Sequence, residues 1–374
     1  MNTSEKIRIL GNGCKFDACS CYPAMRVEKT DDRIGDGIGC SITHSATPDG
    51  KPISLFKVLY TNACTFDCKY CPNRSGCSIK KVMFGGSELA GAFMKLYVQN
   101  YVEGLFLSSG IMRDPDFTME KMVDSVKLLR EKYSYRGYVH LKVMPGASRE
   151  MVKQAAEVAD RLSINVEAPS QSRLKELSDV KDLKTDILRR QRWIDRTNVK
   201  AGHSTQFVVG GAGESDWEIL RMADWEYKNV GLQKAYYSAF TPVCQTPLED
   251  KPRAPVSREV SLYRGDFLLR SYKYKLSEFK DIITEEGMLP PGDPKFHIAL
   301  KNMDGPADLN ELDYQELIRI PGIGHLSAMR LIRMRQREEV TSMRQLHNMG
   351  IVLKRARPFI KVNGHSQATL KQFG

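Results

Sequence analysis

The sequence lacks any apolar run long enough to cross a bilayer, and its first residues contain no apolar stretch of the kind found in a secretory signal. These two absences argue against a membrane-embedded protein and predict a cytoplasmic one with no membrane partner. The mean hydropathy of −0.39 and the 27% of charged residues are typical of a soluble globular chain. With 374 residues, the chain is long enough for one large domain and one small one.

Cysteine is scarce in most of the chain. Of the nine cysteines, eight lie within the first 77 residues, and Cys244 alone follows them. Disulfides are not expected in a reducing compartment, so these thiols are predicted to be buried, to ligate metal or to act as nucleophiles. Their uneven distribution favours a role as ligands.

Acidic residues are outnumbered by basic ones, 45 to 56, which gives a net charge of +11. An excess of this size favours a polyanionic partner. Because nothing in the sequence points to a membrane, nucleic acid is the leading candidate for that partner.

Short apolar runs alternate with amphipathic stretches between residues 54 and 248. The pattern predicts strands at 53–60, 104–107, 138–143, 162–166, 204–209 and 234–237, with helices between them such as 87–101, 118–132 and 149–161. This alternation is typical of parallel βα units. Six such strands predict an α/β fold, a partial (β/α)6 TIM-like barrel whose chemistry lies on the loops after the strands.

The segments outside the barrel differ from it in composition. We expect a Cys-rich N-terminal extension at 1–54, the barrel at 55–248, and a proline-containing connector packed on the barrel at 249–303, with one helical stretch over 258–279. A small all-α domain with tight glycine turns follows at 304–364, and 365–374 is a tail. The C-terminal helical domain is predicted to be separate from the barrel.

Three cysteines with C-x3-C-x2-C spacing follow the first predicted strand: Cys64, Cys68 and Cys71. A structural zinc site closes with four ligands, and Cys77 could be the fourth. Three thiolates on a [4Fe–4S] cluster instead leave one iron without a protein ligand, where chemistry can occur. The spacing favours the cluster, with zinc as the alternative.

This loop, with an aromatic residue directly before the third cysteine, resembles that of the radical S-adenosylmethionine (SAM) superfamily. The resemblance implies that the cysteines hold a [4Fe–4S] cluster and that SAM binds its open iron. It implies an enzyme that reductively cleaves SAM to methionine and a 5′-deoxyadenosyl radical, which abstracts hydrogen from an unactivated C–H bond. An electron donor such as ferredoxin or flavodoxin is the expected protein partner.

The resemblance also implies cofactor contacts at later strand ends. The run 104–110 takes the place of the superfamily's Gly-Gly-Glu turn, although the glutamate is absent here. Lys142 is expected to hold the methionyl carboxylate, and Glu167 can accept hydrogen bonds from ribose hydroxyls. The complete set of predicted SAM-binding residues is Tyr70, Ser108, Ser109, Gly110, Lys142, Asn165, Glu167, Gln206, Gly210 and Gly211.

Four further cysteines form a possible ligand set in the N-terminal extension: Cys14, Cys19, Cys21 and Cys40. They could hold an auxiliary iron–sulfur cluster, with Cys77 as a substitute ligand, or a zinc ion, or they could be partly buried thiols. Cys244 lies past the sixth strand, near Tyr236 and Tyr237 of that strand. These three are candidate catalytic residues, as hydrogen donors to a substrate radical or as substrate contacts. Both tyrosines could also line a pocket or stack on a base.

Two apolar helical hairpins are predicted in the C-terminal domain. A capping box at Asp313 and Glu316 begins a short helix, which is followed by Ile320-Pro-Gly-Ile-Gly324 and a second helix. A weaker copy spans 346–357. Exposed backbone N–H groups at such turns bind phosphate oxygens, and residues 301–374 have a net charge of +5. The predicted nucleic-acid contacts are Gly322, Gly324, Arg330, Arg333, Lys354, Arg355 and Arg357, with Arg74 beyond the cysteine loop. The alternative is a helical domain that serves packing alone.

The cysteine loop and the hairpins together resemble a radical SAM family associated with DNA modification or repair. The resemblance includes Lys15-Phe-Asp17, His44, Cys71-Pro-Asn-Arg74, Tyr236–Phe240 and Leu353–Arg357. It implies an enzyme that modifies or repairs a nucleotide in duplex DNA or structured RNA. Two alternatives stay open: a radical SAM enzyme acting on a small molecule or peptide, with the helical domain as scaffold, and a non-catalytic zinc-bearing nucleic-acid-binding protein.

Overall fold

The computed structural model describes residues 1–14, 17, 41–46, 52–362 and 364–366. Two units divide it, Met1–Tyr263 and Arg264–Gly374. Their boundary falls inside the segment that the sequence predicts as a connector. None of the helices in the described ranges is long and apolar enough to span a bilayer.

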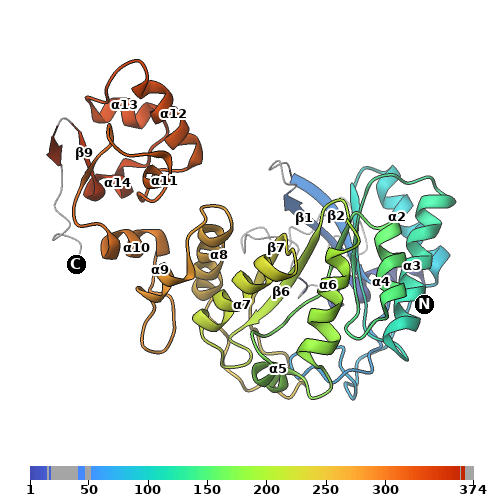
Figure 1. The fold of residues 1–374 in the computed structure, drawn as a ribbon. Coiled ribbons are helices and arrows are strands. Elements are labelled where there is room, and N and C mark those ends of the chain that lie inside the picture. Colours follow the sequence, from blue (N-terminus) through green and yellow to red (C-terminus); the bar gives the residue numbers. More distant parts are fainter. Residues whose placement is uncertain (15–16, 18–40, 47–51, 363, 367–374) are drawn as a thin grey trace. The chain divides into compact units, whose positions relative to one another are not determined.

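The first unit is built on a seven-stranded sheet in the order β1 to β7 (Figure 1). Strand β1 (Ile42–Ala46) runs antiparallel to β2 (Pro52–Leu59). The remaining strands are parallel: β3 (Gly104–Ser108), β4 (Tyr138–Lys142), β5 (Arg161–Ser163), β6 (His203–Val209) and β7 (Lys234–Ala239). The six predicted parallel strands and the partial barrel are therefore confirmed, and β1 is an additional edge strand that the sequence pattern did not predict.

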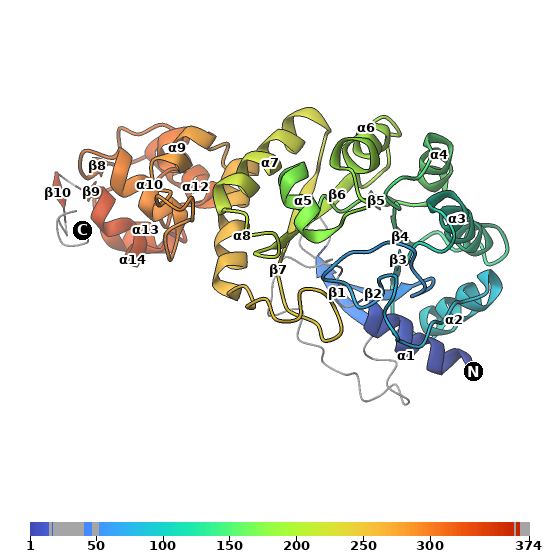
Figure 2. The same cartoon turned by 90° about the horizontal axis from the view of Figure 1, so that it is seen from below.

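Helices cover the outer face of this sheet. Figure 2 shows α2 (Gly86–Val98), α3 (Pro115–Glu131), α4 (Arg149–Val158) and α6 (Arg189–Asp195) following the curve of the strands. Strands β3 and β6 are buried along their whole length, as expected of parallel strands that are covered on both faces. The other helical elements of the unit are α1 (Thr3–Gly13), α5 (Gln171–Leu177), the π-helix Leu183–Leu188 and α7 (Asp216–Asn229).

Short polar side chains set where several of these helices begin. Asp114 accepts a hydrogen bond from the Phe117 amide, and Pro115 occupies the first turn of α3. Ser148 caps α4 in the same way. Ser215 and Glu218 form a capping box at the start of α7. Each cap stands six residues after the end of the preceding strand, so the loops between strand and helix are short and their residues stay near the carboxyl edge of the sheet.

The predicted helix over 258–279 is two helices. Helix α8 (Val256–Arg270) ends before a turn in which Lys273 has a positive φ of 59°, and α9 (Leu276–Lys280) follows. A residue with positive φ cannot continue a right-handed helix, which explains the break.

The second unit is mainly helical, with its own apolar core. Its helices are α10 (Pro294–Asn302), α11 (Tyr314–Leu317), α12 (His325–Arg335), α13 (Met343–Asn348), α14 (Leu353–Ala356) and the 3₁₀ turn Arg357–Phe359. A small sheet of β8 (Ala307–Asp308), β9 (Ile360–Val362) and β10 (His365–Ser366) joins the ends of the domain. The prediction of an all-α domain missed this sheet, because strands of two or three residues show no alternating pattern of apolar and polar residues.

Two helical hairpins pack against each other in the second unit. Helices α11 and α12 flank the first, and α13 and α14 flank the second. Gly322 and Gly350 hold equivalent places, with φ of +84° and +81°. The Val352 amide donates to the Gly322 carbonyl at 2.9 Å, and the Ser327 hydroxyl donates to the Gly350 carbonyl at 3.1 Å. The predicted pair of hairpins is present, and each turn packs on the other.

Candidate active site and cofactor cavity

One cavity at the carboxyl ends of the barrel strands brings together most of the residues predicted to bind the cluster and SAM. Eleven of them line it: Cys64, Cys68, Cys71, Tyr70, Ser108, Ser109, Gly110, Lys142, Asn165, Glu167 and Gln206. They lie in five different strands or in the loops that follow them, and they meet because the strands are parallel. Residues that are far apart in the sequence therefore form one continuous wall of the cavity.

The cysteine loop rests on the turn after β3. The Ile111 amide donates to Cys64 Sγ at 3.4 Å, and the Thr65 amide donates to the Ile111 carbonyl at 2.8 Å. A side chain at Gly110 would overlap the Ala63 carbonyl oxygen, so only glycine allows the loop to lie this close. The predicted role of Gly110 thus has a structural basis, since it lets the first cysteine approach the strand edge.

The three cysteines predicted to hold the cluster all line the cavity. Cys68 is buried, and burial is the largest cause that raises the pKa of its thiol. Burial likewise raises the pKa of Cys71. Such thiols lose their protons when a metal centre binds them as thiolates. These cysteine ligands therefore fit a metal cluster, whose cations would stabilise the thiolates.

Glu167 carries the clearest sign of a missing ligand. Its carboxylate is 5% exposed, and Oε1 accepts a hydrogen bond from Lys181 Nζ at 3.3 Å. Its Oε2 atom is buried and has no donor in hydrogen-bonding geometry. The Tyr70 phenol lies nearby, since burial first and then the Glu167 carboxylate raise the Tyr70 pKa. A buried carboxylate oxygen without a donor fits the predicted contact with a ribose hydroxyl of SAM.

The backbone at Glu167 is also unusual. Its φ is +64°, a conformation that residues other than glycine rarely adopt. The Glu167 amide donates to the Gln206 carbonyl, and its carbonyl accepts from the Val208 amide. These two bonds to β6 hold the residue in place. Strain of this kind persists where neighbouring structure fixes it, and it is concentrated at functional sites.

Lys142 has a partner that the sequence analysis did not assign. Its ammonium forms an ion pair with Asp17, and both side chains line the cavity. Burial opposes both charges, but Lys142 lowers the pKa of Asp17 and Asp17 raises the pKa of Lys142, so both stay charged. The Cys14 thiol also donates to Asp17 Oδ2 at 3.6 Å. The contact of Lys142 with the methionyl carboxylate stays a prediction. In this structure the Lys142 ammonium is bound by the Asp17 carboxylate instead.

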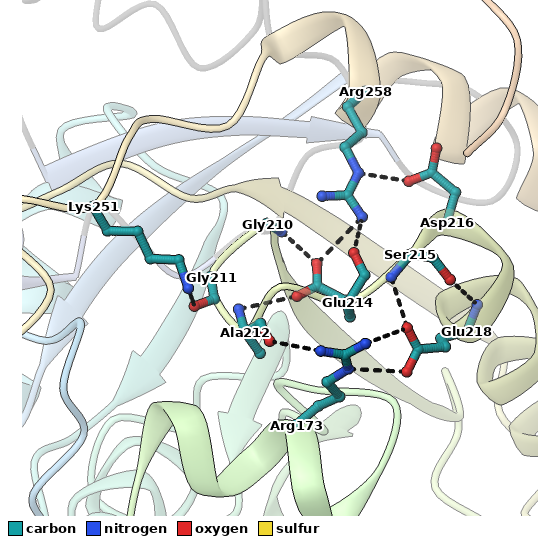
Figure 3. Close-up of polar contacts among 10 residues, drawn as sticks. All are labelled: Arg173, Gly210, Gly211, Ala212, Glu214, Ser215, Asp216, Glu218, Lys251 and Arg258. Atoms are coloured by element: carbon teal, nitrogen blue, oxygen red, sulfur yellow. Dashed lines mark hydrogen bonds and ion pairs between the residues drawn. The ribbon is translucent and has the colours of Figure 1, made fainter. Parts of the chain in front are cut away.

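Gly210 and Gly211 do not line the cavity. They form a turn that Glu214 closes from within, since its carboxylate accepts from the amides of Gly210 and Ala212 (Figure 3). Arg258 then bonds the Glu214 carbonyl at 2.6 Å and Asp216 Oδ1 at 2.6 Å. A Cβ on Gly211 would lie 2.8 Å from Val208 Cγ1, and Val208 does line the cavity. The turn therefore lies directly behind the cavity wall.

The three predicted catalytic candidates in and after the sixth parallel strand also do not line the cavity. Tyr237 is fully buried and stacks on Phe207, with ring centroids 5.7 Å apart. Tyr236 is buried on the neighbouring position of β7, and Cys244 is exposed. Ser238, Phe240 and Thr241, which follow these tyrosines, line the cavity instead. The sequence thus indicated the correct strand, but the residues that line the cavity are those that follow the two tyrosines.

Of the possible auxiliary ligands, Cys14 is buried, whereas Cys19, Cys21 and Cys40 lie outside the described residues. The Cys77 thiol is directed to the Gln245 carbonyl, at 3.4 Å. Across the part of the chain that the structure describes, no three His, Cys, Asp or Glu side chains converge as ligands of a single metal ion.

The predicted nucleic-acid contacts fall into two groups. Arg333, Lys354 and Arg357 are exposed on the second unit. Arg330 donates to the Met349 carbonyl at 3.2 Å, and Arg355 pairs with Asp293 at 3.3 Å, so both also support the hairpins. Lys295 donates to the Ile323 carbonyl at 2.6 Å and fixes the first turn from α10. Arg74, in the first unit, donates to the Asp67 carbonyl at 3.2 Å.

Two charged residues of the cavity wall, Asp17 and Lys181, were given no role from the sequence. Asp17 stands in a segment without periodicity, and Lys181 lies in a loop with several other charged residues. Neither position carries a spacing that distinguishes it from a surface charge. Asp17 does belong to the Lys15-Phe-Asp17 run named in the family resemblance, so that run was the available signal for it.

Residues 58–225 match the family model described as Radical SAM superfamily. The chain is similar to the FeFe-hydrogenase maturase HydG from Carboxydothermus hydrogenoformans, at 14% identity and TM-score 0.46, over 57% of this chain and 50% of that one. It is similar to methylornithine synthase (PylB), at 14% identity and TM-score 0.46, over 57% and 60%. It is also similar to a radical SAM methyltransferase from Sphaerobacter thermophilus, at 13% identity and TM-score 0.44, over 62% and 70%.

The chain spans about half the length of the maturase and three fifths of the synthase. No curated protein matches the sequence.

Proposed function

We propose that this chain is a radical SAM enzyme, with a [4Fe–4S] cluster and SAM as cofactors, and that it modifies or repairs a nucleotide in DNA or structured RNA. The match of residues 58–225 to the Radical SAM superfamily model supports the first part. The observation that carries the nucleotide substrate is the pair of packed hairpins in the second unit, with exposed cations beside them.

The cavity residues fit both cofactors. Cys64, Cys68 and Cys71 would hold the cluster, and the free carboxylate oxygen of Glu167 would accept a ribose hydroxyl. When bound, the two cofactors supply one-electron reductive cleavage of a C–S bond and abstraction of a hydrogen atom from an unactivated C–H bond. The chain's own residues hold SAM in one orientation and keep water out of a largely buried site.

The hairpins support a nucleic-acid partner through three features that coincide. Gly322 and Gly350 give the two turns nearly the same positive φ, so the hairpins have matching backbone geometry. Helix α12 begins at His325 without a side-chain cap, so its first amides have no capping side chain. Arg333, Lys354 and Arg357 add exposed positive charge nearby in the sequence. Amides and cations of this kind bind phosphate oxygens without reading sequence.

A nucleotide within a duplex cannot place a C–H bond inside a cavity at the mouth of a barrel. The target would have to leave the stack, at a cost of about a few kcal/mol, least for a damaged or unpaired base. Contacts that fix the backbone on either side of the target would offset this cost. We assign that role to the hairpins of the second unit.

We expect the full-length protein to bind duplex DNA or structured RNA with an affinity that falls steeply with salt. Replacing Arg333 and Lys354 by Glu should weaken binding and lower the slope of log K against log salt by about one for each phosphate that the protein no longer neutralises. Fluorescence anisotropy with a labelled duplex at several salt concentrations measures both quantities. The matched control replaces Lys280 and Lys301, exposed on α9 and α10, by Glu.

Equally weakened binding in both double variants would mean that total charge, not the hairpins, drives binding. Unchanged binding in the Arg333 and Lys354 variant would remove the support for a nucleotide substrate. The internal bonds of Arg330 and Arg355 favour the alternative in that case, a helical scaffold for an enzyme that acts on a small molecule or peptide.

The reaction itself is tested by anaerobic incubation of the reduced protein with SAM and cellular nucleic acids. We expect mass spectrometry of the nucleosides to show a change that disappears when Cys64, Cys68 and Cys71 are replaced by Ser. A set of nucleosides identical to that of the serine variant would contradict the proposal.

A further inference from the structure

Lys181 is a buried lysine in the cofactor cavity, and the cofactor contacts predicted above give it no role. Its side chain is 6% exposed and lines the cavity together with Cys68, Tyr70 and Glu167. A lysine is rarely buried to this extent without paired charge. Here the pairing is to the Glu167 carboxylate, with 3.3 Å between Nζ and Oε1.

Lys181 shares the cavity with the cysteine ligands predicted to hold the cluster. Its ammonium is paired with the Glu167 carboxylate, and both side chains line the cavity wall that includes Cys64, Cys68 and Cys71. The other cavity lysine that the structure describes, Lys142, is paired with Asp17. Lys181 is therefore the described cavity lysine that pairs with Glu167.

The segment around Lys181 is fixed against the cysteine loop. Gln171 bonds it on both sides, by donating to the Lys181 carbonyl at 3.3 Å and accepting from the Leu183 amide at 2.6 Å. The preceding helix α5 is tied to the cysteine loop, because the Lys69 amide donates to the Leu177 carbonyl at 2.7 Å. Ser178 also donates to Asp67 at 2.5 Å. The ammonium is thus held in place by backbone as well as by its own ion pair.

We propose that Lys181 is a positioning residue that compensates charge at the cluster: its buried ammonium pairs with Glu167 in the cavity that Cys68 also lines, stabilises the reduced cluster and fixes Glu167 toward SAM. One-electron reduction adds one negative charge to a site that already holds three thiolates. A cation in low dielectric beside a ligand sulfur favours the reduced state, and hydrogen bonds to cluster sulfurs tune the potential in the same direction. The inference rests on the superfamily assignment and not on the nucleotide substrate.

The test is a redox titration of the reconstituted protein, followed by electron paramagnetic resonance and made without SAM or nucleic acid. We expect Lys181→Met to shift the midpoint potential of the cluster to a more negative value. Lys181→Arg keeps the charge and should restore the potential toward that of the wild type. The matched control is Lys69→Met, since Lys69 is adjacent to Cys68 in sequence but its ammonium bonds Asp179 and the Lys175 carbonyl at the surface.

A second variant keeps the test decisive where Lys181→Met takes up less iron than the wild type. Glu167→Gln removes the opposing negative charge at constant volume, so it should shift the potential in the opposite direction, to a more positive value. Midpoint potentials equal to that of the wild type in the tested variants would overturn the inference. Because nucleic acid is absent from the titration, failure here is distinguishable from failure of the nucleotide assignment.

Discussion

Glu226 shows how one buried carboxyl group makes stability depend on pH. It is fully buried behind strand β6, and burial raises its pKa to about 8, although the hydrogen bond from Gln191 lowers it slightly. The unfolded chain titrates near 4.5. Since the folded pKa is the higher one, the contribution to stability is complete below 4.5 and is lost as the pH rises through 8.

Replacing Glu226 by Gln should remove this dependence, because the amide cannot ionise. Between pH 5 and 8, we expect the free energy of unfolding of the wild type to fall more steeply than that of the variant, by about 1.4 kcal/mol per pH unit. Urea denaturation at a series of pH values measures the two slopes.

Glu218 is the matched control, because it lies on the same helix and has the opposite shift. Its hydrogen bonds with Arg173 lower its pKa, so its contribution is present at neutral pH and is lost as the pH falls. Glu218→Gln should therefore destabilise the protein at neutral pH and not at acid pH. Parallel slopes for the wild type and Glu226→Gln would show that Glu226 is not protonated in the fold.

Single residues were predictable from sequence where a motif fixed their neighbours. The three cysteines, Tyr70 and Glu167 stand at fixed distances from strand ends, so they reach the cavity wherever the strands form. Lys181 reaches it through a turn between α5 and the π-helix, and the turn depends on bonds from Gln171 and Asp182. No periodicity encodes such bonds, which is why its role became visible only in the folded chain.

At the scale of elements, the turn after β6 gives Gly211 a role that differs from the expected one. Leu177, Val208 and Phe240 leave no room for a methyl group there, with Cβ contacts of 3.2, 2.8 and 3.5 Å. Val208 and Phe240 form part of the cavity wall. The absence of a side chain at Gly211 therefore sets the position of the wall, without any contact between the glycine and SAM.

Gly211→Ala should push this wall inward. We expect the free energy of unfolding to fall by about 1–3 kcal/mol from overpacking, together with weaker SAM binding. Equilibrium dialysis with SAM and urea denaturation report the two effects separately. Gly91→Ala is the control: a Cβ there meets the Tyr133 hydroxyl at an ordinary 3.8 Å, in the middle of α2, where alanine is the better helix former. Unchanged SAM binding in Gly211→Ala would separate this turn from the cofactor cavity.

Helices and strands were predictable from sequence where they were long enough to show a repeating pattern of apolar residues. The six parallel strands and the helices that cover them follow from alternating apolar runs, and the strand bounds agree within a few residues. Strand β1 is short, and the strands of the second unit have two or three residues. Their pairing is decided by tertiary contacts, as is the break between α8 and α9 at Lys273.

At the scale of the whole molecule, the proposed function divides the work between two units. The cofactor cavity belongs to Met1–Tyr263, and the hairpins belong to Arg264–Gly374. If the hairpins bind the backbone and the cavity performs the chemistry, then binding and rate are separable quantities. Changes in one unit should alter the amount of nucleic acid needed, and changes in the other should alter the maximal rate.

The separation can be measured as formation of 5′-deoxyadenosine from SAM while the concentration of nucleic acid is varied. For the Arg333→Glu and Lys354→Glu double variant, we expect half-saturation at a nucleic-acid concentration roughly tenfold higher, with the same plateau, because removing cations that bind phosphates weakens binding uniformly. Cys68→Ser should abolish the rate and leave anisotropy binding unchanged, since Cys68 lies in the first unit. If the hairpin variant instead lowered the maximal rate and left the half-saturating concentration unchanged, the second unit would act in the chemical step. That result would contradict its proposed role in binding the nucleic-acid backbone.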